Sequence, residues 1–144
     1  MVRNRRGALL GSLIAIVVLV GAVGCNTGSG LTGTSWQLNA ITTVTPAYQG
    51  VIPPADQVRY TISFNAGGQF TGTADCNQVS GSWTTTGSDG IDITPGPTTQ
   101  AFCGEASASN MYIAGLAVVT KYTISGTSLS LTAPTGDALQ FTKK

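Results

Sequence analysis

The sequence lacks histidine altogether over its 144 residues. Histidine is the usual general acid or base near neutral pH and the commonest transition-metal ligand. Without it, the many serine hydroxyls have no customary base to activate them, and no nucleophile elbow surrounds any of them. We therefore expect no catalytic residues, no metal site and no cofactor.

Charge is also scarce. Seven Lys and Arg face six Asp and Glu, so charged residues make up 9% of the chain, against about a quarter in an ordinary soluble domain. A nucleic-acid-binding surface needs clustered cations to neutralise phosphates, which excludes that class of function. Because 42% of the residues are apolar, the chain can build a core and is not intrinsically disordered.

Three of the seven cations lie at the start of the chain. Arg3, Arg5 and Arg6 precede an uncharged stretch, residues 7–24, which ends in small residues before Cys25. This order is typical of a secretory signal. Residues 22–25 (AVGC) resemble the bacterial lipobox, whose cysteine is lipidated. The alternative is an uncleaved anchor, because the stretch is just long enough to cross a bilayer.

The lipoprotein interpretation divides the chain into a signal peptide (1–24), lipidated Cys25 with a flexible tether (25–33), and one globular domain (34–144). Loss of the three N-terminal arginines leaves four cations against six acidic residues, so the mature domain is slightly acidic. We expect an exported protein held at the bacterial cell membrane or outer membrane. Several acyl chains on Cys25, palmitate among them, would hold the protein stably in a membrane, whereas a single chain gives only marginal attachment.

The chain has three cysteines, an odd number for an exported protein. With Cys25 lipidated, Cys76 and Cys103 remain, and an exported pair in an oxidising compartment favours a disulfide. Closing a loop of about 28 residues would stabilise the fold by about 3.5 kcal/mol. A redox or metal-binding pair is the alternative, but it needs a nearby cation or a second ligand pair, and the sequence shows neither.

Alternating apolar and polar residues predict short strands. The clearest is 58–64, with Val58, Tyr60, Ile62 and Phe64 on one face. Similar patterns cover 35–40, 69–75, 78–85, 91–94 and 121–124, with two more around 129–131 and 139–141. Residues 41–56, rich in Thr and Pro, are expected to form the one long loop, and a loop of that length is often functional.

A single helix is expected over 106–119, where Tyr112, Leu116 and Val119 recur at helical spacing. Hairpin-length connections imply antiparallel pairing. The fold class is therefore α+β: a curved antiparallel sheet or partial barrel of about seven to eight strands packed on one helix.

Several segments together resemble the META/HslJ-type family. They are Gly33–Leu38 (GTSWQL), Gly72–Trp83 (GTADCNQVSGSW) and Thr99–Cys103 (TQAFC), and the resemblance covers about residues 33–143. The motif residues are Trp36, Asn77, Gly81 and Thr99. Two positions depart from the family: Asp75 stands where Gly is usual, and Gln100 where a basic residue is common.

The resemblance implies a conical half-barrel around one helix, in envelope lipoproteins and heat-shock-associated proteins linked to stress and drug tolerance. It also implies a likeness to pilotin lipoproteins, whose barrels can hold lipid. No catalytic residues carry over. Cys76 and Cys103 transfer as a disulfide, and Asn77 as a structural turn residue.

Other candidate sites have simpler explanations. Asp89 and Asp92 flank a glycine turn but lack the remaining ligands of a calcium loop. Trp36 and Trp83 fall on inward faces, which favours core packing over ligand stacking. An enzyme would have to rely on carboxylates such as Asp75 and Glu105 converging in one cleft.

The sequence thus predicts a non-catalytic, envelope-anchored binding or stress-maintenance module. The alternative is a pilotin-like chaperone that binds lipid or a partner helix in the barrel mouth. The expected partners are the membrane, through the lipid anchor, and an envelope protein or lipid. We expect a monomer that does not bind nucleic acid.

Overall fold

The computed structural model describes residues 30–144. The predicted signal peptide, Cys25 and most of the tether lie outside this range. The described chain forms β1 (Thr34–Val44), β2 (Ala47–Val51), the 3-10 helix η1 (Gln57–Arg59), β3 (Tyr60–Phe64), β4 (Gln69–Ala74), β5 (Asn77–Thr86), β6 (Gly90–Pro95), α1 (Ser109–Leu116), β7 (Lys121–Ser125), β8 (Ser128–Thr132) and β9 (Ala138–Lys143).

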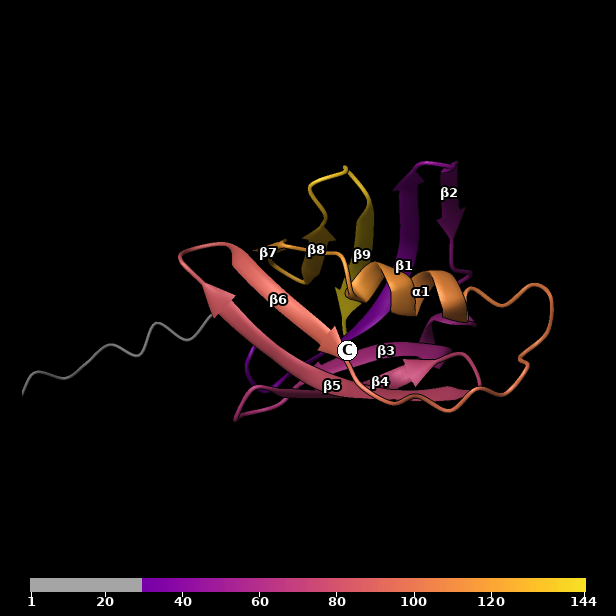
Figure 1. The fold of residues 1–144 in the computed structure, drawn as a ribbon, viewed down its shortest axis with the longest axis horizontal. Coiled ribbons are helices and arrows are strands. Elements are labelled where there is room, and N and C mark those ends of the chain that lie inside the picture. Colours follow the sequence, from indigo (N-terminus) through magenta and orange to yellow (C-terminus); the bar gives the residue numbers. More distant parts are fainter. Residues whose placement is uncertain (1–29) are drawn as a thin grey trace, which may run out of the picture.

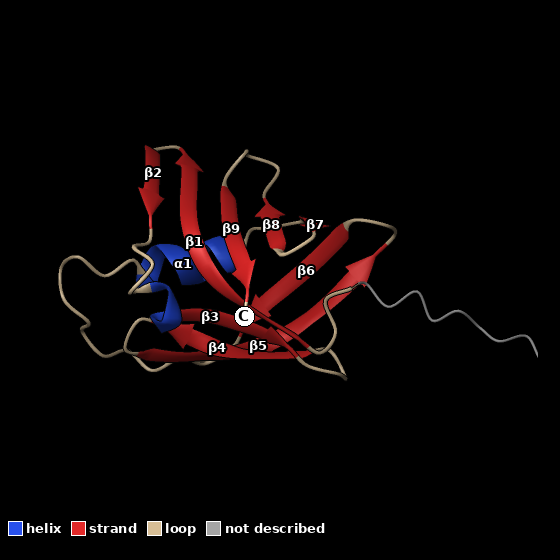
Figure 2. Ribbon diagram, turned by 180° about the vertical axis from the view of Figure 1, so that it is seen from behind, coloured by secondary structure: helices blue, strands red, loops and turns tan. Residues whose placement is uncertain are grey.

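The strands form a closed barrel, so the half-barrel expectation was wrong in this respect. Neighbouring strands pair antiparallel in the order β1, β3, β4, β5, β6, β7, β8 and β9, and β9 pairs back onto β1. The weakest seam is between β6 and β7, which share the single register pair Gly90 and Lys121. Figures 1 and 2 show the strands curving around the helix, with β2 projecting as an extension beside β1.

Strand alternation correctly predicted most of the core. Tyr60, Ile62 and Phe64 are buried, but Val58 is 58% exposed. Val58 lies in η1 instead of a strand, because backbone bonds from Asp56 to Pro53 and from Arg59 to Asp56 wind the chain into a tight turn there. The strand therefore begins at Tyr60, two residues later than the pattern indicated.

The first strand contains an irregularity that reverses its faces. Trp36 and Leu38 are buried, as alternation predicts. The pairing of β1 with β9 shifts between Leu38 and Ala40, and beyond this β-bulge Ile41 is buried in place of Ala40. One extra residue thus moves the apolar face by one position.

Residues 41–56 are not a long loop. β1 continues to Val44, turns at Thr45-Pro46 and returns as β2, with Val44 opposite Ala47 and Ala40 opposite Val51. The β-branched residues of this stretch suit strands. Of its three prolines, Pro46 lies in the hairpin turn, and Pro53 and Pro54 lie beyond the hairpin.

The helix is shorter than predicted, but its inward face is as expected. Tyr112 and Leu116 are completely buried, and the Tyr112 hydroxyl donates to the Thr61 carbonyl at 3.0 Å. Burial raises the pKa of Tyr112. Its ring packs against Tyr60 and Phe141, which fixes α1 across the barrel interior. Over residues 30–144, no helix is long and apolar enough to cross a membrane.

Candidate functional site

A disulfide joins Cys76 to Cys103 and holds the irregular segment 96–108, which connects β6 to α1, against the turn between β4 and β5. The backbone N–H of Cys76 also donates to the sulfur of Cys103 at 3.2 Å. This is the pairing that the cysteine count favoured over a redox or metal role. We call the segment 96–108 the braced loop.

Asn77 holds the same loop through its side chain. It is 4% exposed and is the first residue of β5. Its amide nitrogen donates to the Ala101 carbonyl at 3.1 Å and to the Cys103 sulfur at 3.2 Å. Its amide oxygen accepts from the Thr99 hydroxyl at 3.0 Å and the Ala101 N–H at 2.8 Å. Asn77 is therefore structural, but it fastens a distant loop and does not make a local turn.

The remaining motif residues also have structural explanations. The Thr99 hydroxyl accepts from the Gln78 N–H at 2.9 Å and so joins the loop to β5. A β-carbon at Gly81 would lie 2.2 Å from the Thr94 carbonyl oxygen, so only glycine fits between β5 and β6. The Trp36 indole donates to the Thr34 hydroxyl at 2.7 Å.

Asp75 fastens the start of the helix. Its φ of 62° lies in the left-handed region, which glycine adopts without cost and Asp tolerates better than most residues. Its carboxylate, 4% exposed, pairs with Arg59 at 2.5 Å and accepts from the Tyr60 hydroxyl at 3.2 Å. The same hydroxyl accepts from the Ala108 N–H at 3.1 Å, just before α1.

These contacts set the charge state of Asp75. Burial by itself would raise the pKa of the Asp75 carboxyl. Hydrogen bonds from Ser107 and Tyr60 and the charge of Arg59 outweigh it, so the pKa lies below its usual value. An aspartate held ionised in this way is a structural counter-charge, not a general acid.

The other acidic candidates do not assemble into a site. Asp89 pairs with Lys121 at 3.4 Å, and Asp92 accepts from the Thr94 hydroxyl at 3.3 Å. Glu105 is exposed on the braced loop, whereas the Asp75 carboxylate is buried. Within residues 30–144, no three Cys, Asp or Glu side chains are grouped as metal ligands would be.

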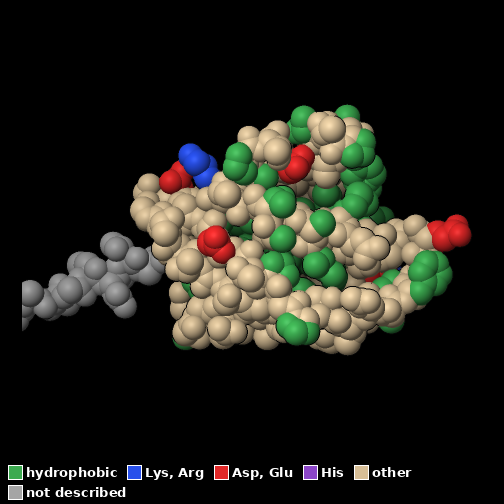
Figure 3. Space-filling model, viewed as in Figure 1, with side chains coloured by type: hydrophobic (Ala, Val, Ile, Leu, Met, Phe, Trp, Pro, Cys, Tyr) green, Lys and Arg blue, Asp and Glu red, His purple; other side chains and the backbone are tan. Residues whose placement is uncertain are grey.

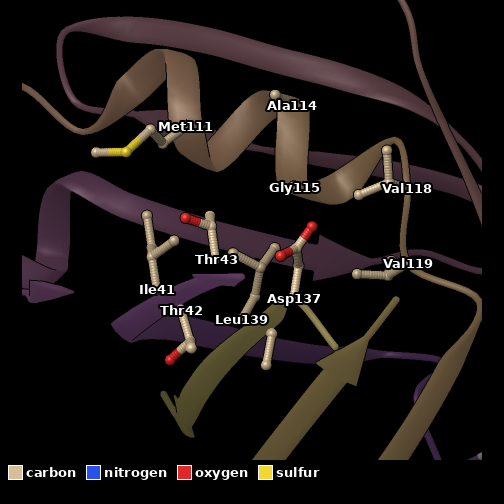
Figure 4. Close-up of a pocket in the computed structure, with 11 residues that line it drawn as sticks. Ile41, Thr42, Thr43, Met111, Ala114, Gly115, Val118, Val119, Asp137 and Leu139 are labelled. Carbon is tan, nitrogen blue, oxygen red and sulfur yellow. The ribbon is translucent and has the colours of Figure 1, made fainter. Parts of the chain in front are cut away.

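An apolar cleft that sequence analysis missed lies between α1 and the facing strands β1 and β9. Its volume is about 230 Å³, and its walls include Ile41, Thr43, Met111, Gly115, Val118 and Leu139. Figure 4 shows the helix above the cleft and the strand side chains below it. We call it the helix cleft. Met111, Ala114, Gly115 and Val118 form a second stripe at helical spacing, and this stripe was the signal available in the sequence.

The rim of the helix cleft is exposed and largely uncharged. Met111 is 36% exposed and Val118 is 49% exposed. Apolar side chains gather over the helix and around β2 in Figure 3, where charged groups are few. Exposed apolar side chains that line a concave surface indicate a binding site more strongly than scattered ones do.

One carboxylate belongs to the helix cleft. Asp137, at the end of the β8–β9 turn and immediately before β9, is half-buried on its wall. One oxygen accepts from the Val44 N–H at 2.7 Å, and the other accepts from the Thr135 hydroxyl at 2.9 Å. Among the residues that the structure describes, Asp137 forms no ion pair.

The fold and these sites together define a small closed antiparallel barrel with one helix, a disulfide-braced loop and an apolar cleft. The META domain family model matches residues 29–144, and the chain belongs to this family. No curated protein matches it.

Two solved structures share the fold. The first is an NMR structure of a protein from Burkholderia xenovorans, with 23% identity and a TM-score of 0.63, covering 79% of this chain and 83% of the other. The second is the crystal structure of a DUF4847-family protein from Bacteroides vulgatus, with 16% identity and a TM-score of 0.58, covering 78% and 93%.

Proposed function

We propose that this META-domain protein is a non-catalytic, lipid-anchored binding module of the cell envelope that takes the apolar part of a small amphiphile into the helix cleft. The observation that carries the proposal is the cleft itself, an apolar hollow with an exposed rim between α1, β1 and β9.

The size of the cleft limits what it holds. Whole-ligand pockets enclose about 300–1,000 Å³, whereas an apolar cavity of about 150 Å³ suffices for benzene. The helix cleft, at about 230 Å³, therefore suits a ring or a short alkyl chain rather than a complete lipid. Burying that group contributes about 0.8 kcal/mol for each CH₂ removed from water.

The predicted anchor supports an envelope role. A lipidated Cys25 and the short tether after it would keep the domain close to a membrane surface, where amphiphiles concentrate. The disulfide and Asn77 hold the braced loop, and Asp75 acts through Tyr60 on the residue before α1. Together they secure the start of α1, which forms one wall of the cleft, and this supports a binding role.

A pilotin-like chaperone that captures a protein segment is the second candidate. The specific observation in its favour is the exposed apolar surface of the β1–β2 hairpin beside the cleft, where Val44 is 50%, Tyr48 43% and Val51 74% exposed. Substituting Val51 by Ser would abolish partner capture in this case and leave small-amphiphile binding unchanged.

Methionine labelling provides the direct test. The chain has two methionines, Met1 and Met111, and export with signal cleavage would leave Met111, at the cleft, as the one labelled residue. We expect the lipidated protein in phosphatidylcholine nanodiscs to show a single ¹³C-methyl resonance that shifts saturably with n-hexanol.

Two matched variants locate the binding. Ala114 and Ala117 are both exposed on or next to the helix, but only Ala114 lines the cleft. Ala114→Leu should fill the cleft and abolish the hexanol shift, whereas Ala117→Leu should leave it intact. A linear, non-saturating shift, or the same shift in both variants, would contradict the proposal. A second methionine resonance from Met1 would contradict only the prediction that the signal is cleaved, and it would leave the binding proposal untouched.

A further inference from the structure

We propose that the helix cleft selects amphiphiles that end in an ammonium group, with the Asp137 carboxylate as the counter-charge. This inference rests on the proposed function and adds the chemical class of the ligand: a small primary amine with a short apolar chain.

The position of Asp137 is the first reason. Its side chain comes from the β8–β9 turn and points toward the helix across the cleft, near Gly115 and Val118 (Figure 4). An apolar chain placed along Met111, Gly115 and Leu139 would therefore bring its polar end to this carboxylate.

The unused capacity of the carboxylate is the second reason. Each oxygen accepts one hydrogen bond, from Val44 N–H or the Thr135 hydroxyl, whereas a carboxylate offers about four acceptor sites. These two bonds hold the group in one orientation and leave acceptor sites free for a donor from a ligand. An ammonium supplies three donors and a positive charge.

The walls of the cleft provide no competing charge. Among the described residues that line it, Asp137 is the one charged side chain. The Thr43 hydroxyl donates to the Pro46 carbonyl at 2.7 Å and is therefore already engaged. An anionic amphiphile would meet the carboxylate with no cation among these walls to offset the repulsion. The charge of Asp137 by itself should therefore favour the binding of amines over that of acids.

The strength of the effect follows from the partial burial of Asp137. Apolar walls strengthen a charge-assisted hydrogen bond relative to water, but solvent still reaches this half-buried group. We expect an ammonium to bind about tenfold more tightly than a hydroxyl on the same chain.

The test compares three probes of equal chain length on the lipidated protein in phosphatidylcholine nanodiscs, with the Met111 methyl as reporter. We expect n-hexylammonium to bind about tenfold more tightly than n-hexanol, and n-hexanoate to bind most weakly. Raising the salt concentration should weaken the binding of n-hexylammonium and leave the binding of n-hexanol unchanged. Replacing part of the lipid with phosphatidylethanolamine shows whether a lipid headgroup amine competes with the free amine.

Asp137→Asn is the decisive variant. An asparagine can still accept from Val44 N–H and, through its amide nitrogen, donate to the Thr135 hydroxyl, so only the charge is lost. We expect equal affinities for hexylammonium and hexanol in this variant. Asp92→Asn makes the same change of net charge on β6, outside the cleft, and should keep the tenfold preference.

The outcomes separate this inference from the proposed function. If hexanol binds saturably and hexylammonium binds no better, the ammonium inference is wrong and the binding function stands. If no probe binds, both are wrong. If Asp137→Asn weakens all three probes equally, Asp137 only supports the turn, which also overturns the inference. The Val44 amide resonance reports whether the turn is intact in the variant.

Discussion

The two regions that flank α1 are built on opposite principles. The braced loop has no regular structure, yet it is held by the disulfide, by the Asn77 amide and by the hydrogen bond from the Gln78 N–H to its own Thr99 hydroxyl. The helix cleft lies between a regular helix and two regular strands, yet it contains unfilled apolar space. Polar contacts and a disulfide thus hold the irregular segment in place, whereas apolar side chains line the space between the helix and the two strands.

The difference follows from how the backbone N–H and C=O groups of each region find hydrogen-bond partners. Backbone amides in an irregular segment need partners, so buried polar side chains such as Asn77 are placed to supply them. The backbone groups of strands and helices bond to one another within the sheet or the helix. Only side-chain volume then decides whether the space between these elements is filled. The small side chain of Ala114 leaves part of that volume open, whereas Gly115 lets the helix pack closely against Leu139.

Of the changes that test this comparison, removing the disulfide should have the largest effect on the free energy of unfolding. We expect the double variant Cys76→Ser with Cys103→Ser to lose about 3.5 kcal/mol of unfolding free energy, because the unfolded chain regains the entropy of an open loop. Thermal unfolding should begin roughly 15 °C lower. Reduced wild-type protein should match the double variant, and an unchanged melting temperature would show that the braced loop holds without its covalent link.

Asn77→Ala should come next, with a loss of about 2–3 kcal/mol, because the substitution leaves the Ala101 N–H and carbonyl without their partner. Urea unfolding measures the loss. The adjacent, exposed Gln78→Ala variant keeps its backbone bonds to Thr99 and should change stability by less than about 0.5 kcal/mol. Equal losses in the two variants would show that the amide has no special role.

The Asp75 ion pair should contribute less and depend on pH. Because the pKa of Asp75 is lowered by folding, its stabilisation is present above the unfolded value of about 3.9 and disappears as the pH falls through the lower folded value. At pH 7 we expect Asp75→Asn to cost about 1 kcal/mol, a small figure because Arg59 is 47% exposed.

The pH dependence is read from unfolding of the wild type and Asp75→Asn between pH 7 and pH 2. The difference in stability should be constant at neutral pH and vanish in acid. A difference that persists at pH 2 would assign the cost to the altered hydrogen bond with the Tyr60 hydroxyl instead of to the charge.

The smallest effect on stability is expected on the cleft side. Ala114→Leu fills apolar space at an exposed position and should change the unfolding free energy by less than about 0.5 kcal/mol, although it abolishes ligand binding. Thermal unfolding without ligand tests this. A large destabilisation would show that the helix cleft is too tight to accept a side chain.

Sequence patterns predicted much of the fold and little of the site. Tyr60, Ile62, Tyr112 and Leu116 were placed in the core because their spacing follows the strand or helix period. The hairpin of β1 and β2 was mistaken for a loop. Its alternation is obscured by exposed apolar residues such as Val51, which carry no inward-facing signal.

The polar contacts were harder to predict than the core. Asn77 appeared to be a turn residue because its partners, Ala101 and Cys103, are more than twenty positions away along the chain. Asp137 carried no signal at all, since its orientation depends on Val44 in a strand from the other end of the domain.

The sequence by itself determined the inward face of most strands and of the helix, because strand and helix periods are local properties of the chain. Tertiary structure alone decided that β9 closes onto β1, that the braced loop fastens the start of α1, and that a carboxylate stands on the wall of an apolar cleft. These features depend on register and volume between segments distant in sequence, and local patterns do not specify either.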